Sequence, residues 1–271
     1  MIKNIFLCAD DYAQNEPISE GILILANNRK LNAISCLVNS PHWQETSGAL
    51  KAVQKHTYLG LHFNLTFGKA LSANWQKNYG SHFGNLSNLI QQAYFRRLDS
   101  ANIEAEFCAQ LDAFRQQLGQ EPDFIDGHQH VHQLPIIREA MLKVYKQMKM
   151  NAFWRKTSND WRDFLSLKPL AINLLGGYRF KNLLKEQTIQ TNSSFSGLYN
   201  FVCAKKYPQY FRQFLKLIRT EGLILCHPGI QSRDVNDPLH LYRHHEFNYF
   251  MGTAFPNDLQ NAQCRLAQKP C

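Results

Sequence analysis

Long hydrophobic runs are absent from this 271-residue chain. The best apolar run, residues 21–26, is far shorter than the roughly 18 residues that a membrane span needs. Only five apolar residues follow the N-terminal tetrapeptide before Asp10 and Asp11, whereas a secretory signal needs about 7–15. The sequence therefore predicts neither a membrane span nor a secretory signal.

Cysteine motifs are missing as well. The seven cysteines are odd in number and widely spaced, and none forms a C-x-x-C pair. Neither a disulfide framework nor a cysteine zinc site fits this pattern. We expect reduced thiols in a cytoplasmic protein, with Cys8, Cys36 and Cys226 as small core residues.

Charge is in excess on the basic side: 30 lysines and arginines stand against 21 acidic residues, a formal charge of +9. The basic residues are scattered and no recognition motif surrounds them, so nucleic acid is not expected as a partner. An anionic substrate or a membrane surface remains open, because net charge bears on association and not on fold. The sequence does not decide the oligomeric state, and it is compatible with a homodimer.

Repeats, low-complexity tracts and Pro/Gly/Ser linkers are also absent, so residues 1–271 are expected to form a single catalytic domain. Short apolar runs predict strands at 5–8, 33–38, 58–61, 124–125, 152–154 and 223–226. Helical periodicity predicts helices at 17–27, 103–118, 135–148 and 207–219. This alternation predicts an α/β fold with a mainly parallel sheet. At this length we favour a TIM-like (β/α) barrel, closed or nearly closed and compatible with an incomplete or distorted ring, over an open sheet.

Two stretches, 67–97 and 157–199, are long for simple loops between a strand and a helix. Long insertions on a barrel usually shape the substrate site, so we expect them over the C-terminal face. Trp75, Tyr79 and Tyr199 are candidates to stack on sugar rings. The alternative is that these aromatic side chains are packed cover.

Charged or metal-binding side chains follow five of the predicted strands. They are Asp10 and Asp11, His62, Asp126 and His128, Arg155, and His227. In α/β barrels the active site lies at the carboxyl ends of the strands and draws on several of them. These residues are therefore expected to converge on one face.

Carboxylates and imidazoles together suit a divalent metal held by three protein ligands with open positions. A second carboxylate and a further imidazole would then serve as base and acid of a metal-assisted hydrolase. Other interpretations stay open at this point. Asp10 and Asp11 would also suit the N-cap of the helix that begins near Pro17. The alternating histidines at 128, 130 and 132 would point one way if extended, but a loop would separate them, and we expect one ligand among them.

Four stretches resemble the YdjC-type carbohydrate deacetylases, which include chitooligosaccharide deacetylases (ChbG-like) and hopanoid-associated HpnK-type enzymes. They are Ala-Asp-Asp-Tyr at 9–12, Gly-Leu-His-Phe-Asn-Leu-Thr at 60–66, Phe-Ile-Asp-Gly-His-Gln-His-Val-His at 124–132, and Leu-Cys-His-Pro-Gly at 225–229. The resemblance is strongest over residues 5–229. It implies a barrel-like α/β fold and removal of acetyl groups from N-acetylated sugars, free or lipid-linked, with one divalent metal, Mg or Zn.

The resemblance also implies residue roles. Asp11, His62 and His128 would hold the metal, and Asp10 would be the catalytic base. His227 would stand where a proton donor is expected.

Two further roles follow from the same resemblance. Arg155 would contact the acetamide or the sugar, and Asp126 would orient a ligand or bind substrate. Tyr12-Ala13 and Gly127 depart from the usual family residues, which leaves the ligands intact and the substrate preference open.

Three rival functions fit the same barrel. A glycoside hydrolase would need two carboxylates and no metal, which leaves the histidines unexplained. A metal-dependent phosphoesterase would suit the basic charge. An inactive carbohydrate-binding homologue would have no need of a base beside a metal.

Overall fold

The computed structural model describes residues 2–158, 172–201, 203–231 and 237–270. Eight strands are present in this part of the chain: β1 (Lys3–Tyr12), β2 (Ala33–Cys36), β3 (Tyr58–Phe63), β4 (Phe124–Gly127), β5 (Phe153–Trp154), β6 (Phe195–Ser196), β7 (Gly222–Cys226) and β8 (Cys264–Leu266).

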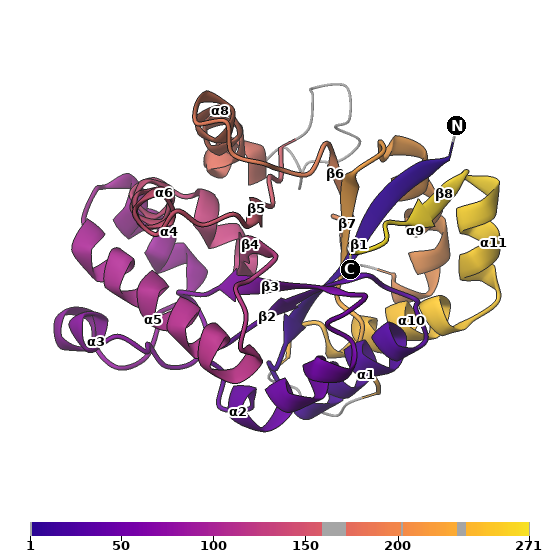
Figure 1. The fold of residues 1–271 in the computed structure, drawn as a ribbon, viewed down its shortest axis with the longest axis horizontal. Helices are drawn as coiled ribbons and strands as arrows, with labels where there is room; N and C mark the ends of the chain where they lie inside the picture. Colours follow the sequence, from indigo (N-terminus) through magenta and orange to yellow (C-terminus); the bar gives the residue numbers. More distant parts are fainter. Residues whose placement is uncertain (1, 159–171, 202, 232–236, 271) are drawn as a thin grey trace.

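The α-helices of the described residues lie around the outside of the sheet (Figure 1). They are α1 (Glu16–Asn27), α2 (Trp43–Thr46), α3 (Ala73–Tyr79), α4 (Leu86–Tyr94), α5 (Ser100–Leu118), α6 (Ile137–Gln147), α8 (Tyr178–Glu186), α9 (Tyr207–Leu217), α10 (His240–Met251) and α11 (Ala254–Asn261). Shorter helical turns are η1 (Ser47–Ala52), η2 (His128–Gln133), η4 (Asn173–Gly177) and η5 (Ala204–Lys206). No helix of the described residues is both long and apolar enough to cross a membrane.

All pairs of neighbouring strands are parallel, and the order across the sheet is β5-β4-β3-β2-β1-β7-β6. β8 pairs with the first residues of β1. The predicted α/β fold with a parallel sheet is confirmed. Parallel strands covered by helices are buried on both faces, which is why the strands read as continuous apolar runs in the sequence.

The sheet is strongly curled. The rings of Phe6 on β1 and Phe153 on β5 lie 5.4 Å apart, although three strands separate β1 from β5 in the sheet. Neighbouring strands are about 4.8 Å apart, so in a flat sheet these rings would be roughly 19 Å apart. Their contact puts both rings inside a barrel, beside an inner apolar cluster to which Cys8, Phe124 and Leu223 belong.

Residues 190–196 bring the two edges of the sheet together. The Trp154 N–H donates to the Gln190 carbonyl at 2.9 Å, and four residues later the Ser194 carbonyl accepts from the Leu223 N–H at 2.9 Å. One short segment therefore bonds to β5 on one side and β7 on the other. The seven strands thus form a curled, TIM-like half-barrel as expected from the sequence, its two edges joined, within the described residues, only through this segment, with β8 outside it.

Element boundaries differ from the sequence prediction in informative places. Asp10, Asp11 and His62 lie within β1 and β3 and not after them. α6 begins at Ile137, so Pro135 is not its first residue; Ile136, with φ of 68°, precedes it. The cap of α1 is Asn15, whose side chain accepts from the Ile18 N–H at 3.1 Å. The N-cap interpretation of Asp10 and Asp11 is therefore wrong.

Candidate functional site

A bulge in β1 turns both acidic residues to the same side. β1 pairs with β2 through Ala9–Ile34 and then Tyr12–Cys36, so β1 uses three residues where β2 uses two. Asp11 takes the left-handed conformation there, with φ of 69°. In a regular strand, neighbouring side chains face opposite ways. The extra residue removes that alternation, and both carboxylates line one cavity.

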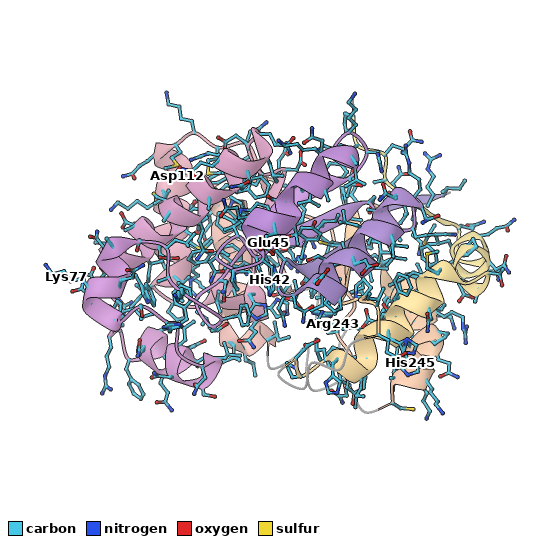
Figure 2. The ribbon with its side chains drawn as sticks, turned by 90° about the horizontal axis from the view of Figure 1, so that it is seen from below. His42, Glu45, Lys77, Asp112, Arg243 and His245 are labelled. Atoms are coloured by element: carbon cyan, nitrogen blue, oxygen red, sulfur yellow. The ribbon has the colours of Figure 1, made fainter. Side chains whose placement is uncertain are left out.

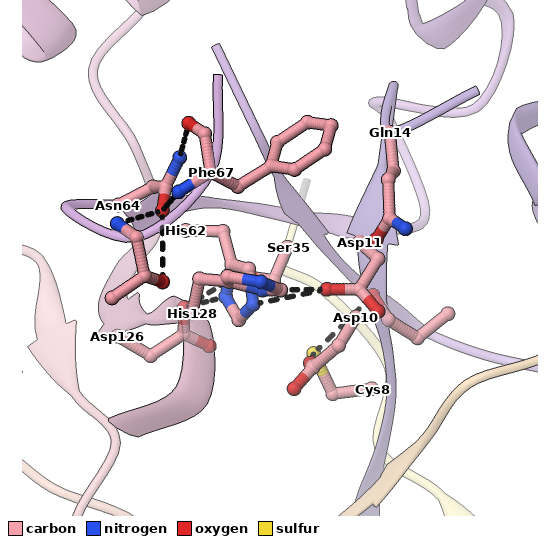
Figure 3. A network of polar contacts seen from close by, with 12 residues as sticks. Cys8, Asp10, Asp11, Gln14, Ser35, His62, Asn64, Phe67, Asp126 and His128 are labelled. Carbon is pink, nitrogen blue, oxygen red and sulfur yellow. Dashed lines mark hydrogen bonds and ion pairs between the residues drawn. The ribbon is translucent and has the colours of Figure 1, made fainter. Parts of the chain in front are cut away.

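Asp11, His62 and His128 form a group that could hold a metal ion. One ligand atom from each residue lies within 4.8 Å of the others. Asp11 Oδ1 is 3.0 Å from His128 Nδ1 and 3.5 Å from His62 Nε2. Figure 3 shows the two imidazoles directed at this carboxylate. One carboxylate and two imidazoles are a donor set typical of catalytic divalent metals.

His62 is held from behind. Its Nδ1 lies 2.6 Å from Asp126 Oδ1 and 2.9 Å from Ser35 Oγ, and Ser35 also donates to Asp126 at 2.6 Å. A carboxylate on the far ring nitrogen fixes the orientation of a ligating histidine, which leaves Nε2 directed at Asp11. The register of β3 and β4 places this pair, because His62 stands directly opposite Asp126.

Arg155 connects two of the carboxylates beneath the cavity. Its guanidinium donates to both oxygens of Asp10, at 2.7 and 2.6 Å, and Nη2 lies 2.5 Å from Asp126 Oδ2. Its side chain is fully buried and does not line the cavity. We expected Arg155 to contact an acetamide or a sugar; in the structure its guanidinium contacts Asp10 and Asp126.

The charges around the Asp11–His62–His128 group favour a bound cation, as its donor atoms do. Four carboxylates, those of Asp10, Asp11, Asp126 and Asp237, stand against the guanidinium groups of Arg155 and Arg243. The negative excess favours positive charge. Burial lowers the pKa of His62, but the carboxylates of Asp126 and Asp10 outweigh burial and raise it to about 10.

The histidine-rich segment is a turn and not an extended strand. Gln129 and His130 have φ of 51° and 61° within η2, so the alternating side chains do not point one way. His128 faces Asp11, whereas His132 Nε2 lies 3.0 Å from the Arg155 carbonyl oxygen. Gly127 allows this approach, because a Cβ there would lie 2.8 Å from His132 Nδ1.

Asn64 shapes the loop that follows β3. Its Oδ1 accepts from the N–H groups of Thr66 and Phe67 at 2.9 and 3.0 Å, and its amide donates to the Phe67 carbonyl at 2.6 Å. The Phe67 ring centroid then lies 6.4 Å from that of His128. The Asn-Leu-Thr stretch after His62 thus sets one wall of the site (Figure 3).

A cavity of about 500 Å³ opens above these residues. His227 lines it from the end of β7, and because Ala9 pairs with Cys226, His227 follows β7 at the level of Asp10. The His227 N–H donates to Glu246 Oε2 at 2.6 Å, and the Tyr199 hydroxyl donates to Glu246 Oε1 at 2.6 Å. The buried Glu246 thereby ties two walls of the cavity together.

Arg243 lies on the same helix as Glu246 and faces the cavity. Its Nη2 donates to Asp11 Oδ2 at 2.9 Å, and its Nε donates to Asp237 Oδ2 at 2.6 Å. Arg243 is buried, whereas its neighbour His245 is partly exposed on α10 (Figure 2). The Arg243 guanidinium bonds only Oδ2 of Asp11, so Oδ1 faces the two histidines.

The carboxylates and histidines at the carboxyl ends of the strands belong to a pattern that a known protein family shares. The protein-family model described as "YdjC-like protein" matches residues 4–261 of this chain. The chain belongs to the YdjC-like family. The match extends past Gly229, so α10, with Arg243 and Glu246, lies inside the family region.

Curated relatives of this YdjC-like chain carry deacetylase names. A carbohydrate deacetylase of Danio rerio is 28% identical over 144 residues, which is 52% of this chain and 45% of that protein. A chitooligosaccharide deacetylase of Yersinia pestis (strain Pestoides F) is 32% identical over 141 residues, 51% of this chain and 53% of that protein. The YdjC-like chain spans about half the length of the curated relatives it matches.

A solved structure from Enterococcus faecalis V583, described as a candidate cellobiose-phosphate cleavage protein, has the same fold. It superposes with a TM-score of 0.75 at 17% identity, over 98% of this chain and 97% of that one. At this identity the likeness shows the fold of the YdjC-like chain and not its substrate.

The structure brings six of the ten candidate residues to the cavity wall: Asp10, Asp11, His62, His128, Tyr199 and His227. Asp126 and Arg155 lie directly behind that wall. The stretches 67–97 and 157–199 contribute Phe67, Leu86, Ile90, Ile172, Leu175, Gly197, Leu198 and Tyr199 to it. Residues 159–171 of the second stretch lie outside the described residues.

Trp75 and Tyr79 are not part of the cavity. Trp75 is 4% exposed and packs 4.8 Å from the ring of Tyr79 and 5.2 Å from that of Phe83. The Tyr79 hydroxyl accepts from the Asp99 N–H at 2.8 Å. Both side chains of α3 pack against neighbouring residues and one of them contacts the start of α5. Their position does not support the expectation that they stack on a sugar.

Sequence reasoning assigned no role to Arg243, Glu246 and Asp237, although the polar stretch at 243–246 stands out. The Arg-His-His-Glu stretch at 243–246 is polar, but it lies on a helix without an apolar stripe and follows no strand. The helical spacing of Arg243 and Glu246, three residues apart, was the signal that could have placed both on one inward face.

We expect replacing Glu246 by Gln to remove a pH dependence from folding stability. Burial raises the pKa of Glu246 to about 7, although bonds from Tyr199 and the His227 N–H oppose this. Because the folded pKa lies above the unfolded value, stability is fully present at low pH and is lost as pH rises toward 7. Relative to Glu246→Gln, the wild type should lose on the order of 3 kcal/mol between about pH 4.5 and pH 8.

Urea unfolding of both proteins across that range measures the difference. Glu139→Gln, at an exposed carboxylate, is the matched control and should differ from wild type by a constant amount. A wild-type minus Glu246→Gln difference that does not change with pH would contradict the assignment.

Proposed function

We propose that this chain is a metal-dependent carbohydrate N-deacetylase that hydrolyses the acetamide of an N-acetylated sugar. One observation carries the proposal: Asp10 lies in the same cavity wall as the Asp11–His62–His128 group. A hydrolase needs a base beside the electrophilic centre, whereas a binding protein needs none. The names of the curated relatives support the same reaction class.

Asp11, His62 and His128 would hold one divalent cation, Mg²⁺ or Zn²⁺. When bound, the cation would supply positive charge that polarises an amide carbonyl and acidifies water. Imidazole ligands suit Zn²⁺ and carboxylates suit Mg²⁺, so the mixed donor set leaves both in the proposal.

Asp10 would act as the base and His227 as the acid. Asp10 accepts a proton from the attacking water as the water oxygen bonds to the acetamide carbon. His227 gives a proton to the sugar nitrogen as the carbon–nitrogen bond breaks, because an unprotonated amine is a poor leaving group. The products are acetate and a free amino sugar.

Asp126 and Arg155 are positioning residues in this scheme. Arg155 holds Asp10 through two bonds and Asp126 holds His62 Nδ1. Neither lines the cavity, so neither is assigned contact with substrate. Tyr199 lines the cavity, and we propose that its ring face borders the sugar while its hydroxyl stays on Glu246.

The six described cysteines are free thiols. This supports a reducing compartment, and we therefore propose a cytoplasmic location.

Removing one proposed ligand should strongly weaken metal binding. EDTA-stripped wild type is expected to bind one equivalent of Zn²⁺ or Mg²⁺ in calorimetry. Asp11→Asn and His62→Gln should each weaken binding by at least the 10–100-fold that loss of an outer partner costs. Asp112→Asn and His82→Gln, at surface positions, are matched controls.

Activity separates the rival functions. Acetate release from N-acetylated oligosaccharides should stop on chelation and return with metal. A metal-free glycoside hydrolase would release shorter sugars and ignore EDTA, and a phosphoesterase would act on sugar phosphates. Tight metal binding by Asp11→Asn and His62→Gln would place the metal elsewhere and overturn the site.

A further inference from the structure

An exposed apolar patch lies where α4 meets the turn before α8. We call it the rim patch: Tyr94, Phe95, Leu174 and Tyr178, whose side chains are 46%, 69%, 74% and 64% exposed. The Tyr94 hydroxyl donates to the Leu174 carbonyl at 3.4 Å, which places the two segments side by side. Single exposed apolar residues need no explanation, but four gathered on two adjoining elements indicate an interaction surface.

The rim patch is continuous with the cavity. Leu86 and Ile90 of α4 line the cavity, and Tyr94 follows at the same four-residue spacing. Residues four apart share one face of a helix, so one apolar stripe runs from the cavity wall to the patch. On the other side, Leu175 lines the cavity and Leu174 is exposed.

The same two segments carry more positive than negative charge. Arg96, Arg97, Arg179 and Lys185 are exposed, and the Arg97 guanidinium lies 5.4 Å from the Phe95 ring centroid. Asp99 and Glu186, also exposed, are the acidic residues at the ends of these segments, so cations outnumber acids there. Apolar side chains that enter a lipid interface, flanked by cations that pair with acidic headgroups, are the chemistry of peripheral membrane binding.

We propose that the rim patch docks the protein on an anionic lipid bilayer. Charge complementarity favours this occupant, since four exposed cations border the apolar side chains and only two acidic residues stand at the ends of the segments. Docking would bring the opening of the cavity to the lipid surface, with the Leu86–Ile90–Tyr94 stripe leading inward. This consequence rests on the proposed deacetylase site; the docking itself does not.

Vesicle sedimentation tests the proposal. We expect the wild type to partition onto phosphatidylcholine vesicles that contain 30% phosphatidylserine, and to be released by 0.5 M salt. Arg96→Gln/Arg97→Gln should weaken partitioning about 25-fold, at roughly fivefold per cation. Phe95→Ser/Leu174→Ser should weaken it at least tenfold. The controls Lys51→Gln/Lys55→Gln and Met251→Ser change exposed residues elsewhere and should bind as wild type.

Three outcomes would overturn the proposal. Equal binding to vesicles with and without phosphatidylserine would show that anionic lipid does not drive binding. Equal losses in the control variants would show that the rim patch is not the binding surface. A shift from dimer to monomer in the rim variants without lipid, seen by sedimentation velocity, would make the patch a contact between two copies. Acetate release from a short soluble oligosaccharide reports the proposed function separately, so either proposal can fail alone.

Discussion

Replacing Asp10 by Asn is expected to lower the rate of acetate release by about 10²–10⁴, the usual contribution of a general base. Asn keeps the shape of the side chain but has no basic oxygen to accept the water proton. Because the wild type and Asp10→Asn should both bind the metal, the loss should appear in kcat and should not be restored by added metal. Steady-state kinetics across a metal titration, with metal binding measured in parallel, give the answer.

Asp126→Asn is the matched control for this experiment. Like Asp10, Asp126 is a buried carboxylate paired with Arg155, but it does not line the cavity. Its loss should weaken the hold on His62 and therefore the affinity for metal by about 10–100-fold. Saturating metal should rescue Asp126→Asn and leave Asp10→Asn inactive. If Asp10→Asn retains near-wild-type kcat, Asp10 is structural and the base lies elsewhere.

The barrel and the convergence of the site could be predicted from the sequence for a simple reason. Apolar runs mark buried parallel strands, and the carboxyl ends of parallel strands meet at one edge. Asp11, His62 and His128 are far apart in the chain but follow or end such runs, so their meeting required no knowledge of side-chain geometry. The two-residue strand β6 was missed because it has no apolar run around it, whereas β5, equally short, was predicted from the apolar run at 152–154.

Local backbone geometry could not be predicted. Alternation would send Asp10 and Asp11 to opposite faces, and only the bulge in β1 brings them together. The positive φ angles of Gln129 and His130 likewise convert an alternating stretch into a turn. Both features depend on pairing with neighbouring strands and turns, which the residues themselves do not encode in a periodic pattern.

Contacts between residues far apart in the chain also could not be predicted from the sequence. Arg155 directly follows β5, so the sequence placed it near the site but could not show that Asp10 and Asp126 occupy its guanidinium. Arg243 and Glu246 lie on a helix after the last barrel strand, where no strand-end rule applies. Trp75 was placed by its loop and its aromatic character, whereas burial against Tyr79 and Phe83 decided its role.

Replacing Arg155 by Met should be among the most destabilising single changes in this protein. The guanidinium is fully buried and is the countercharge that bonds both Asp10 and Asp126. Without it, two neighbouring carboxylates remain buried next to each other. Loss of one partner from a buried ion pair costs about 3–5 kcal/mol, much of it from the charge left unpaired. Lys at this position should recover only part of the loss, since a point charge cannot bond both carboxylates as a planar fork does.

A double-mutant cycle distinguishes this account from simple loss of packing. If the unpaired charge is the cause, Arg155→Met should cost markedly less in the Asp126→Asn background, where one of the two carboxylates is already neutral. Urea unfolding gives each free energy, and Arg212→Met, which removes an exposed arginine 3.4 Å from Asp258, should cost less than about 1 kcal/mol. Equal costs of Arg155→Met in both backgrounds would show that the methylene stem and not the charge stabilises the barrel. Since Arg155 also holds the proposed base, stability and catalysis at this site would then have separate causes.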